Sequence, residues 1–270
     1  MEERQEQRQK RITTKKSVVS KITIVVAVFI FVLSAYQLIR IFSEYHKGAK
    51  EYDKLAEDTT ESQEEENEEE ALGQDGHTPL KVDFEELKKT NVDVVGWIHF
   101  DEPSISYPIV KGEDNEKYLT TTFEKNKNSA GAIFMDALNN GEFADRNTYI
   151  YGHNMKNGSM FAQLHKFGKQ EYYEQNSYFY IYTPNGKEVK YQIFAVCIVG
   201  GTSRSYTRFF NNDTEYLDYL NYEKSIALYD TGVEVNAESQ ILTLSTCISS
   251  AKDKRLFVHG VKVGETEVKK

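Results

Sequence analysis

An uncharged run of 18 residues, from Ile22 to Ile39, constrains this chain more than any other feature. A helix of that length extends about 27 Å at ~1.5 Å per residue, close to the thickness of a bilayer core. Seven Lys and Arg residues lie within residues 1–21, ahead of the run. The positive-inside rule therefore predicts a cytoplasmic N-terminus and places the rest of the chain, after the run, outside the cell.

A cleaved signal peptide is the alternative, because it carries the same basic flank. It needs a shorter apolar run and a small-residue cleavage site, which Ser34-Ala35-Tyr36 matches poorly. The sequence therefore favours an uncleaved, single-pass membrane anchor. The expected organisation is a cytoplasmic basic tail over 1–21, a transmembrane anchor over 22–39, an acidic stalk or linker over 40–80, and a globular domain over 81–270.

Acidic residues are concentrated in residues 44–80, which hold thirteen Asp and Glu against three Lys. Such a segment cannot bury much apolar surface, so the composition predicts a solvated spacer that is disordered or only partly helical. Residues 81–270 hold 22 basic and 26 acidic residues. This acidic balance argues against a nucleic-acid partner, because phosphate binding needs a basic face.

The globular part reads as short strands joined by turns and short helices. Pro184-Asn185-Gly186 between two strand-like runs is a hairpin signal. Eight strands with few long helices predict a β-barrel or sandwich with added helices. The expected strands are 95–100, 105–110, 132–135, 148–151, 178–183, 188–199, 239–246 and 255–263. The expected helices are 84–92, 116–121, 159–167, 170–175 and 213–228, the last with Asp213 or Thr214 as its N-cap.

The chain has two cysteines, and their sequence contexts differ. Cys247 ends a strand-like segment and opens onto a predicted loop over 248–253, so it is rigidly held and can still be exposed. Cys197 lies in mid-strand between apolar neighbours, where burial would raise the pKa of its thiol and make it inert. We interpret Cys247 as a nucleophile and Cys197 as a core residue, although a disulfide between them is also compatible with the sequence.

A cysteine nucleophile needs an acid–base partner, usually histidine. His153 closes a predicted strand next to Gly152, a residue that permits close approach of backbone or ligand. Strand position alone does not separate it from His259 in the last strand. His165 is expected on a helix surface, and His46 and His77 lie in the predicted stalk.

Arg255 begins the last predicted strand, eight residues after Cys247. Alternation along a strand places Arg255, Phe257 and His259 on one face. If this strand pairs with the strand of Cys247 as a hairpin, Arg255 lies beside the thiol. A guanidinium there could stabilise the oxyanion of an acyl transfer.

Together these residues resemble the sortase family. The resemblance is carried by Thr243-Leu244-Ser245-Thr246-Cys247, by Arg255, and by Tyr151-Gly152-His153-Asn154-Met155, and it covers roughly residues 84–263. Class B sortases in particular are similar over 91–98, 114–119 and 152–161, and in the long helix before the Cys247 strand. The resemblance implies a closed eight-stranded β-barrel.

The resemblance also implies a reaction. Cys247 would attack a Thr carbonyl in the C-terminal sorting motif of a secreted protein, and a peptidoglycan amine would take the acyl group from the thioester. His153 would be the general acid and base, and Arg255 would hold the oxyanion. Implied substrate-binding residues are Asn115, Leu119, Thr202, Tyr206, Thr207 and Ser245. Neither a metal nor a cofactor is expected.

Two other functions are compatible with the sequence. One is a non-catalytic ectodomain that binds cell-surface ligands on the same barrel. The other is a cysteine protease that hydrolyses its acyl-enzyme.

Overall fold

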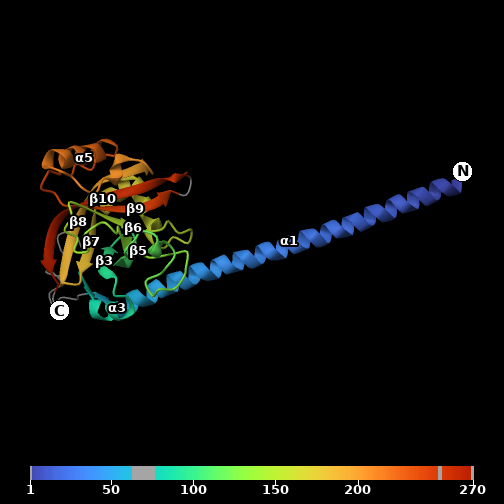
Figure 1. Cartoon of the computed structure of the whole chain (residues 1–270), viewed down its shortest axis with the longest axis horizontal. Helices are drawn as coiled ribbons and strands as arrows, with labels where there is room; N and C mark the ends of the chain where they lie inside the picture. The colour runs from blue at the N-terminus through green and yellow to red at the C-terminus, as the bar shows by residue number, and fades with distance from the viewer. Residues whose placement is uncertain (1, 63–76, 249–250, 269–270) are drawn as a thin grey trace. The chain divides into compact units, whose positions relative to one another are not determined.

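The chain is seen in a computed structural model that describes residues 2–62, 77–248 and 251–268 (Figure 1). It divides into two compact units, residues 1–47 and residues 48–270. The first unit is formed by helix α1, which spans Glu2–Thr59 and continues into the second unit. All strands lie in the second unit.

The apolar run of the sequence lies within α1. In the described part of the chain, α1 is the one helix whose length and composition allow it to cross a membrane. Its apolar side chains, such as Val25 and Phe31, are exposed. Length and composition fit a membrane anchor, and they fit a signal sequence as well.

Eight strands form a closed barrel, which confirms the expected fold class. Neighbouring strands follow the order β10-β8-β7-β3-β4-β5-β6-β9, and β9 returns to β10. The strands are β3 (Val94–Phe100), β4 (Ile105–Lys111), β5 (Ile133–Met135), β6 (Asn147–Tyr151), β7 (Tyr178–Thr183), β8 (Lys187–Gly200), β9 (Ile241–Ile248) and β10 (Ala251–Glu267). All eight coincide with predicted segments, and β10 is longer than expected at both ends.

Two pairings in the barrel are parallel, β4 with β5 and β6 with β9, and the others are antiparallel. The predicted hairpin is confirmed: β7 and β8 are joined through residues 184–186, with Thr183 opposite Lys187. Gly186 has φ +81°, a conformation that glycine adopts without steric cost. The expected loop over 248–253 is shorter than predicted, because Ile248 and Ala251 already pair; Ser249 and Ser250 lie outside the described residues.

The helices pack on the barrel; α4 has the predicted bounds, and the other predicted helices are shorter than the sequence predicts. They are α3 (Phe84–Thr90), α4 (Gln170–Gln175) and α5 (Asp213–Ser225), with 3₁₀ turns η1 (Lys117–Leu119), η2 (Phe161–Gly168) and η3 (Arg204–Tyr206). The expected N-cap of α5 is wrong. Asn212 caps the helix through its side chain, which accepts from the Glu215 N–H at 2.9 Å, while Asp213 pairs with Arg146.

The prediction of a solvated stalk over 44–80 is wrong for residues 48–62. The end of α1 packs on the barrel: Tyr52, Leu55 and Thr59 are buried, and they recur at the three- and four-residue spacing of one helix face. The Tyr52 hydroxyl donates to the Gly131 carbonyl at 2.7 Å. Strand β1 (Thr60–Ser62) then pairs with β2 (Leu80–Val82). The most acidic part, residues 63–76, lies outside the described residues.

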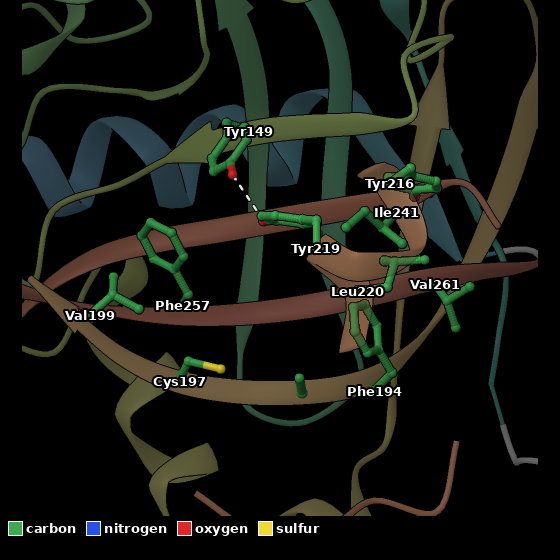
Figure 2. Close-up of a cluster of buried hydrophobic side chains, with 11 residues drawn as sticks. Tyr149, Phe194, Cys197, Val199, Tyr216, Tyr219, Leu220, Ile241, Phe257 and Val261 are labelled. Atoms are coloured by element: carbon green, nitrogen blue, oxygen red, sulfur yellow. Dashed lines mark hydrogen bonds between the residues drawn. The ribbon is translucent and has the colours of Figure 1, made fainter. Parts of the chain in front are cut away.

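Cys197 lies in a buried cluster between β8, β10 and α5 (Figure 2). Its neighbours include Phe257 of β10 and the α5 side chains Tyr216, Tyr219 and Leu220. Burial, and then the proximity of Glu223, raises the pKa of the Cys197 thiol far above its usual range. Both cysteines are free, so no disulfide joins them.

Candidate active site

Three adjacent strands bring Cys247, His153 and Arg255 to one end of the barrel. Strands β6 and β9 run parallel with Tyr151 opposite Ser245, so the ends of both strands lie together. His153 follows β6 directly, and Cys247 is near the end of β9. Strand β10 returns antiparallel with Arg255 directly opposite Cys247. The predicted hairpin contact between these two residues is therefore present.

The three residues open into one pocket of about 310 Å³. Its walls come from β6, β9 and β10, and from the segments that precede β5 and α5. A pocket of this size at a strand end can hold several residues of an extended peptide. Its lining consists of Asn115, Leu119, Phe134, Tyr151, Gly152, His153, Tyr206, Ser245, Thr246, Cys247 and Arg255.

Gly152 makes the turn into His153 possible. A Cβ atom at this position would lie 2.5 Å from Ile133 Cδ1 and 2.6 Å from the ring of Phe161, so any larger residue would displace the core. The sequence analysis expected backbone or ligand to approach Gly152 closely; the groups that do so are the side chains of Ile133 and Phe161. The Gly152 N–H donates to the Ser245 carbonyl at 3.1 Å, and the Phe161 N–H donates to the His153 carbonyl at 3.0 Å. The backbone around His153 is held on both sides.

The imidazole of His153 is half-buried, and its tautomer is set by one contact. Its Nε2 lies 2.7 Å from the Leu119 carbonyl oxygen. A carbonyl only accepts, so Nε2 carries the proton. In the neutral ring Nδ1 then holds the lone pair, which a general base requires.

Cys247 is held through its own backbone. Its carbonyl oxygen lies 2.9 Å from Asn154 Nδ2 and 3.0 Å from His165 Nε2. The expectation that His165 lies on a helix surface is wrong, because its half-buried ring reaches the strand of the nucleophile. The two side chains hold the peptide group that follows Cys247 in place.

Arg255 brings a positive charge to the pocket, and this charge affects the pKa of Tyr206. Burial raises the pKa of Tyr206, the guanidinium of Arg255 opposes that rise, and an anionic Cys247 adds to it. A phenol, a guanidinium and a thiol are therefore close enough to interact electrostatically. A negative charge that develops in this pocket would face Arg255.

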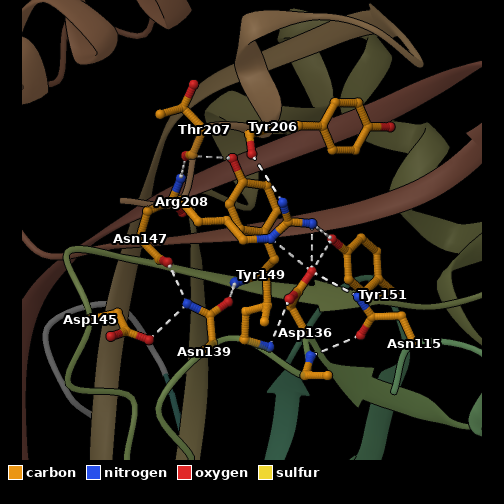
Figure 3. Close-up of polar contacts among 12 residues, drawn as sticks. Asn115, Asp136, Asn139, Asp145, Asn147, Tyr149, Tyr151, Tyr206, Thr207 and Arg208 are labelled. Carbon is orange, nitrogen blue, oxygen red and sulfur yellow. Dashed lines mark hydrogen bonds and ion pairs between the residues drawn. The ribbon is translucent and has the colours of Figure 1, made fainter. Parts of the chain in front are cut away.

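A buried ion pair supports one wall of the pocket (Figure 3). The carboxylate of Asp136 is buried and accepts from Arg208 Nε at 2.8 Å and from the Tyr151 hydroxyl at 2.8 Å. It also accepts from Asn115 Nδ2 at 3.1 Å, while Asn115 Oδ1 accepts from the Ala137 N–H at 2.8 Å. Two pocket residues, Tyr151 and Asn115, are thus oriented by one carboxylate.

Comparison with known proteins identifies the family. The sortase domain model matches residues 98–263, more than half of the chain. The chain belongs to the sortase family. The matched range contains the whole pocket described above.

Sortases of class B are the relatives of this sortase. Sortase B of Listeria monocytogenes is 37% identical over 168 residues, 62% of this chain and 68% of the relative. Sortase B of Bacillus anthracis, solved in complex with AAEK1, is 31% identical with a TM-score of 0.68, covering 83% of this chain and 99% of that structure. A Staphylococcus aureus sortase B–substrate complex is 32% identical with a TM-score of 0.63, covering 67% of this chain and 84% of that structure.

The class B homology makes this sortase a cysteine transpeptidase of the kind that anchors surface proteins. Among the described residues, the two groupings of side chains that could hold a metal, His77–His99–Asp101 and Cys197–Glu223–His259, both lie outside the pocket. The pocket chemistry is that of a thiol, an imidazole and a guanidinium.

The predicted substrate-binding residues divide into two groups. Asn115, Leu119, Tyr206 and Ser245 line the pocket of the sortase. Thr202 and Thr207 do not belong to its lining: Thr202 is exposed, and the Thr207 hydroxyl donates to the Arg204 carbonyl at 2.7 Å.

The sequence analysis missed several residues at the site. Tyr151 and Thr246 line the pocket and lie within the quoted motifs, but they were given no role there. Asn154 lies in the quoted motif but has no predicted role there. Nothing in the local sequence indicates Asp136 or Arg208, because 72 positions separate them and only the barrel brings them together.

His259, the other candidate for the base, is a core residue. Its ring is buried, Nδ1 lies 2.9 Å from the Thr243 hydroxyl, and Nε2 lies 3.3 Å from the carboxylate of Glu223. Since Thr243 donates to Asn147, its oxygen accepts from His259 Nδ1. His77, expected in the stalk, is also buried, at a distance from this pocket.

Proposed function

We propose that this sortase cleaves secreted proteins at a Thr carbonyl within a C-terminal sorting motif and transfers the new C-terminus to a peptidoglycan amine. The observation that carries the proposal is the pairing of Cys247 with Arg255 across β9 and β10, in a pocket shared with His153. This shared pocket supports the roles of nucleophile for Cys247, base for His153 and oxyanion-binding cation for Arg255.

In the first half-reaction the Cys247 sulfur attacks the Thr carbonyl carbon, and its proton passes to His153. The C–S bond forms, the C–N bond breaks, and His153 protonates the departing amine. The product is a thioester on Cys247. In the second half-reaction an amine attacks the thioester, His153 takes its proton, and the thiol is restored.

Arg255 stabilises the oxygen that becomes negative in both tetrahedral intermediates. Its guanidinium is always charged and can donate two parallel hydrogen bonds, which suits it to stabilise an oxyanion in this pocket. Asn115, Leu119, Tyr206 and Ser245 would hold the peptide, with one apolar and three polar side chains suited to an extended backbone.

The proposed location is the outer face of the cell membrane, with the N-terminus in the cytoplasm. The apolar helix and the seven basic residues in 1–21 support a single-pass anchor in this orientation. The partners are then a secreted protein with a sorting motif and the peptidoglycan peptide that supplies the amine.

A quenched peptide library with a fixed Thr tests the proposal, using the full chain in detergent with and without a peptide amine. We expect cleavage that depends on Cys247 and a ligated product when amine is present. Cys197→Ala is the matched control and should retain both activities. Absence of turnover with every peptide would overturn the enzyme assignment for these substrates, and cleavage without any ligation would favour hydrolysis.

A further inference from the structure

Three side chains that can bind a metal, those of His77, His99 and Asp101, lie close together, and none of them lines the pocket. His77 precedes β2, His99 is in β3, and Asp101 follows β3 in the turn to β4. Their ligand atoms all lie within 4.8 Å of one another. The sequence analysis expected no metal, because the resemblance implies none and no metal-ligand cluster is visible in the sequence.

The distances within this cluster suit a tetrahedral cation. His77 Nδ1 lies 3.0 and 2.9 Å from the two Asp101 oxygens, and His99 Nε2 lies 3.4 Å from Asp101 Oδ1. Metal–ligand bonds of about 2.0–2.1 Å give ligand-to-ligand edges of roughly 3.3–3.4 Å in a tetrahedron. The carboxylate of Asp101 is thus already near the required distance from both rings, and the ligand atoms of His77 and His99 lie within 4.8 Å of each other, so a small closing movement would bring all three groups around one ion.

The outer partners of both rings fit this arrangement. His77 Nε2 lies 3.2 Å from the Glu188 carboxylate, which only accepts, so Nε2 is protonated and Nδ1 faces the cluster. A carboxylate on the far nitrogen is the usual support of a metal-bound histidine. His99 Nδ1 lies 3.3 Å from the Ser106 hydroxyl, which leaves its Nε2 directed at Asp101.

The cluster is held rigidly on one side and open on the other. The ring of His77 stacks on Tyr180 with centroids 3.4 Å apart and is only 5% exposed. The Asp101 side chain is 48% exposed. Solvent can therefore supply the fourth ligand, which completes a three-protein-ligand site.

We propose that His77, His99 and Asp101 bind a divalent transition metal of the zinc type. Two imidazoles and one carboxylate suit Zn²⁺ and its neighbours, whereas Ca²⁺ and Mg²⁺ prefer all-oxygen sites. Without metal, a proton lies between His77 Nδ1 and Asp101, so binding displaces one proton. The ion would hold His77 against β3, so the ion would have a structural role.

The test is calorimetric titration of the full chain in detergent micelles with Zn²⁺, without a histidine tag. A Cys247→Ala background removes the pocket thiol as a competing ligand. We expect one equivalent bound per chain, with binding lost in His99→Ala and in Asp101→Asn, both of which alter accessible groups. Glu188→Gln should weaken affinity by about ten- to a hundredfold. His46→Ala, on the exposed face of α1, is the control and should bind normally.

Co²⁺ provides a second readout. Bound to two imidazoles and a carboxylate, it should show visible d–d bands without thiolate charge transfer. The proposal is overturned if no metal binds the folded protein, or if stoichiometric binding survives in His99→Ala. Thiolate charge transfer that disappears in Cys197→Ala would also overturn it, because the ion would then lie in the buried Cys197–Glu223–His259 group.

Discussion

Cys247 and Cys197 flank the same strand, and each has a histidine and a charged residue nearby. Cys247 lies opposite Arg255 on one side of β10, and Cys197 lies opposite Phe257 on the other side. Residues that face each other across antiparallel strands project to the same face, and so do residues two apart on one strand. The two thiols therefore lie on one face of the barrel wall, two positions apart along β10.

Helix α5 makes the difference between the two thiols. It packs over Cys197 (Figure 2), whose sulfur donates to the Glu223 carbonyl at 3.4 Å, whereas the pocket that Cys247 lines contains no α5 residue. The covered cysteine is 0% exposed, while Cys247 is half-buried and lines a pocket. The strand pattern predicts that both side chains point to the same face of the barrel wall. The position of α5 decides which of the two thiols is accessible to a substrate.

The strongest test of this comparison exchanges the two thiols for alanine. Cys247→Ala should abolish peptide cleavage, because no other group on this face can form the thioester. Cys197→Ala should retain turnover per folded molecule and lose about 1 kcal/mol of stability through a small cavity. Peptide cleavage and thermal unfolding measure the two effects. Loss of turnover in Cys197→Ala with Cys247→Ala still active would reverse the assignment.

The second test concerns Arg255, the charged residue opposite Cys247 in the pocket, which we call the open region. Arg255→Ala should lower kcat by about a hundred- to a thousandfold, the usual cost of removing an oxyanion donor. Arg255→Lys should recover little, because an ammonium cannot reproduce the planar guanidinium fork.

Steady-state kinetics on the cleaved peptide measure this loss. Lys254→Ala is the matched control, since Lys254 is exposed and neighbours Arg255 on the strand. Equal losses in Lys254→Ala and Arg255→Ala would mean that the strand, and not the guanidinium, supports the reaction.

Much of the open region could be predicted, because the signals for its residues span only a few positions of the sequence. A hairpin joins Cys247 and Arg255 across eight residues, so strand alternation alone predicts that they meet. His153 lies next to Gly152 at a strand end, which is also a local signal. The eight strands were likewise visible as short strand-like segments between turn signals, and β7 has the predicted bounds.

Other parts depend on contacts between distant segments and could not be predicted. The packing of Tyr52 and Leu55 is hidden in an acidic composition, although their helical spacing was a usable signal. The cover of α5 over Cys197 and the Asp136–Arg208 pair both require the closed barrel. Cys197 was assigned to the core correctly from its apolar neighbours, but the partner Glu223 was not foreseen.

The third test concerns the buried pair Glu223–His259 in the region that α5 covers. Glu223 and His259 are 0% exposed and lie 3.3 Å apart. Removing the Glu223 side chain leaves a buried polar nitrogen of His259 without this neighbour, so Glu223→Ala should lower the free energy of unfolding by about 1–3 kcal/mol. Turnover per folded molecule should stay unchanged, because α5 does not reach the pocket.

Urea unfolding and active-site titration separate these two effects. Asn221→Ala, an exposed position on the same helix, is the control and should change stability by less than about 0.5 kcal/mol. A Glu223 variant that unfolds like wild type but loses turnover would show that the covered region takes part in catalysis.

The last test uses Asp136, the buried carboxylate of the open region. Burial raises the pKa of Asp136, but the Leu138 N–H, the Tyr151 hydroxyl and Arg208 outweigh it, so the pKa is lowered. A lowered pKa in the folded state means that the carboxylate stabilises the fold above the unfolded-state pKa of about 4. That contribution is lost as pH falls through the folded-state pKa. Asp136→Asn should therefore cost about 1–3 kcal/mol at pH 7, and this difference from wild type should shrink in acid.

Asp136→Asn also distinguishes the two buried carboxylates by their effect on substrate. Asp136 orients Asn115 and Tyr151, so its loss should raise KM more than it lowers kcat, whereas Glu223 touches no pocket residue. Unfolding at pH 7 and pH 3 and peptide kinetics at pH 7 measure both consequences. A stability difference that is the same at both pH values would exclude the charge of Asp136 as its source. An unchanged KM would mean that the pocket wall keeps its geometry without the Asp136 carboxylate. Asp136 and Glu223 would then not differ in their effect on substrate binding.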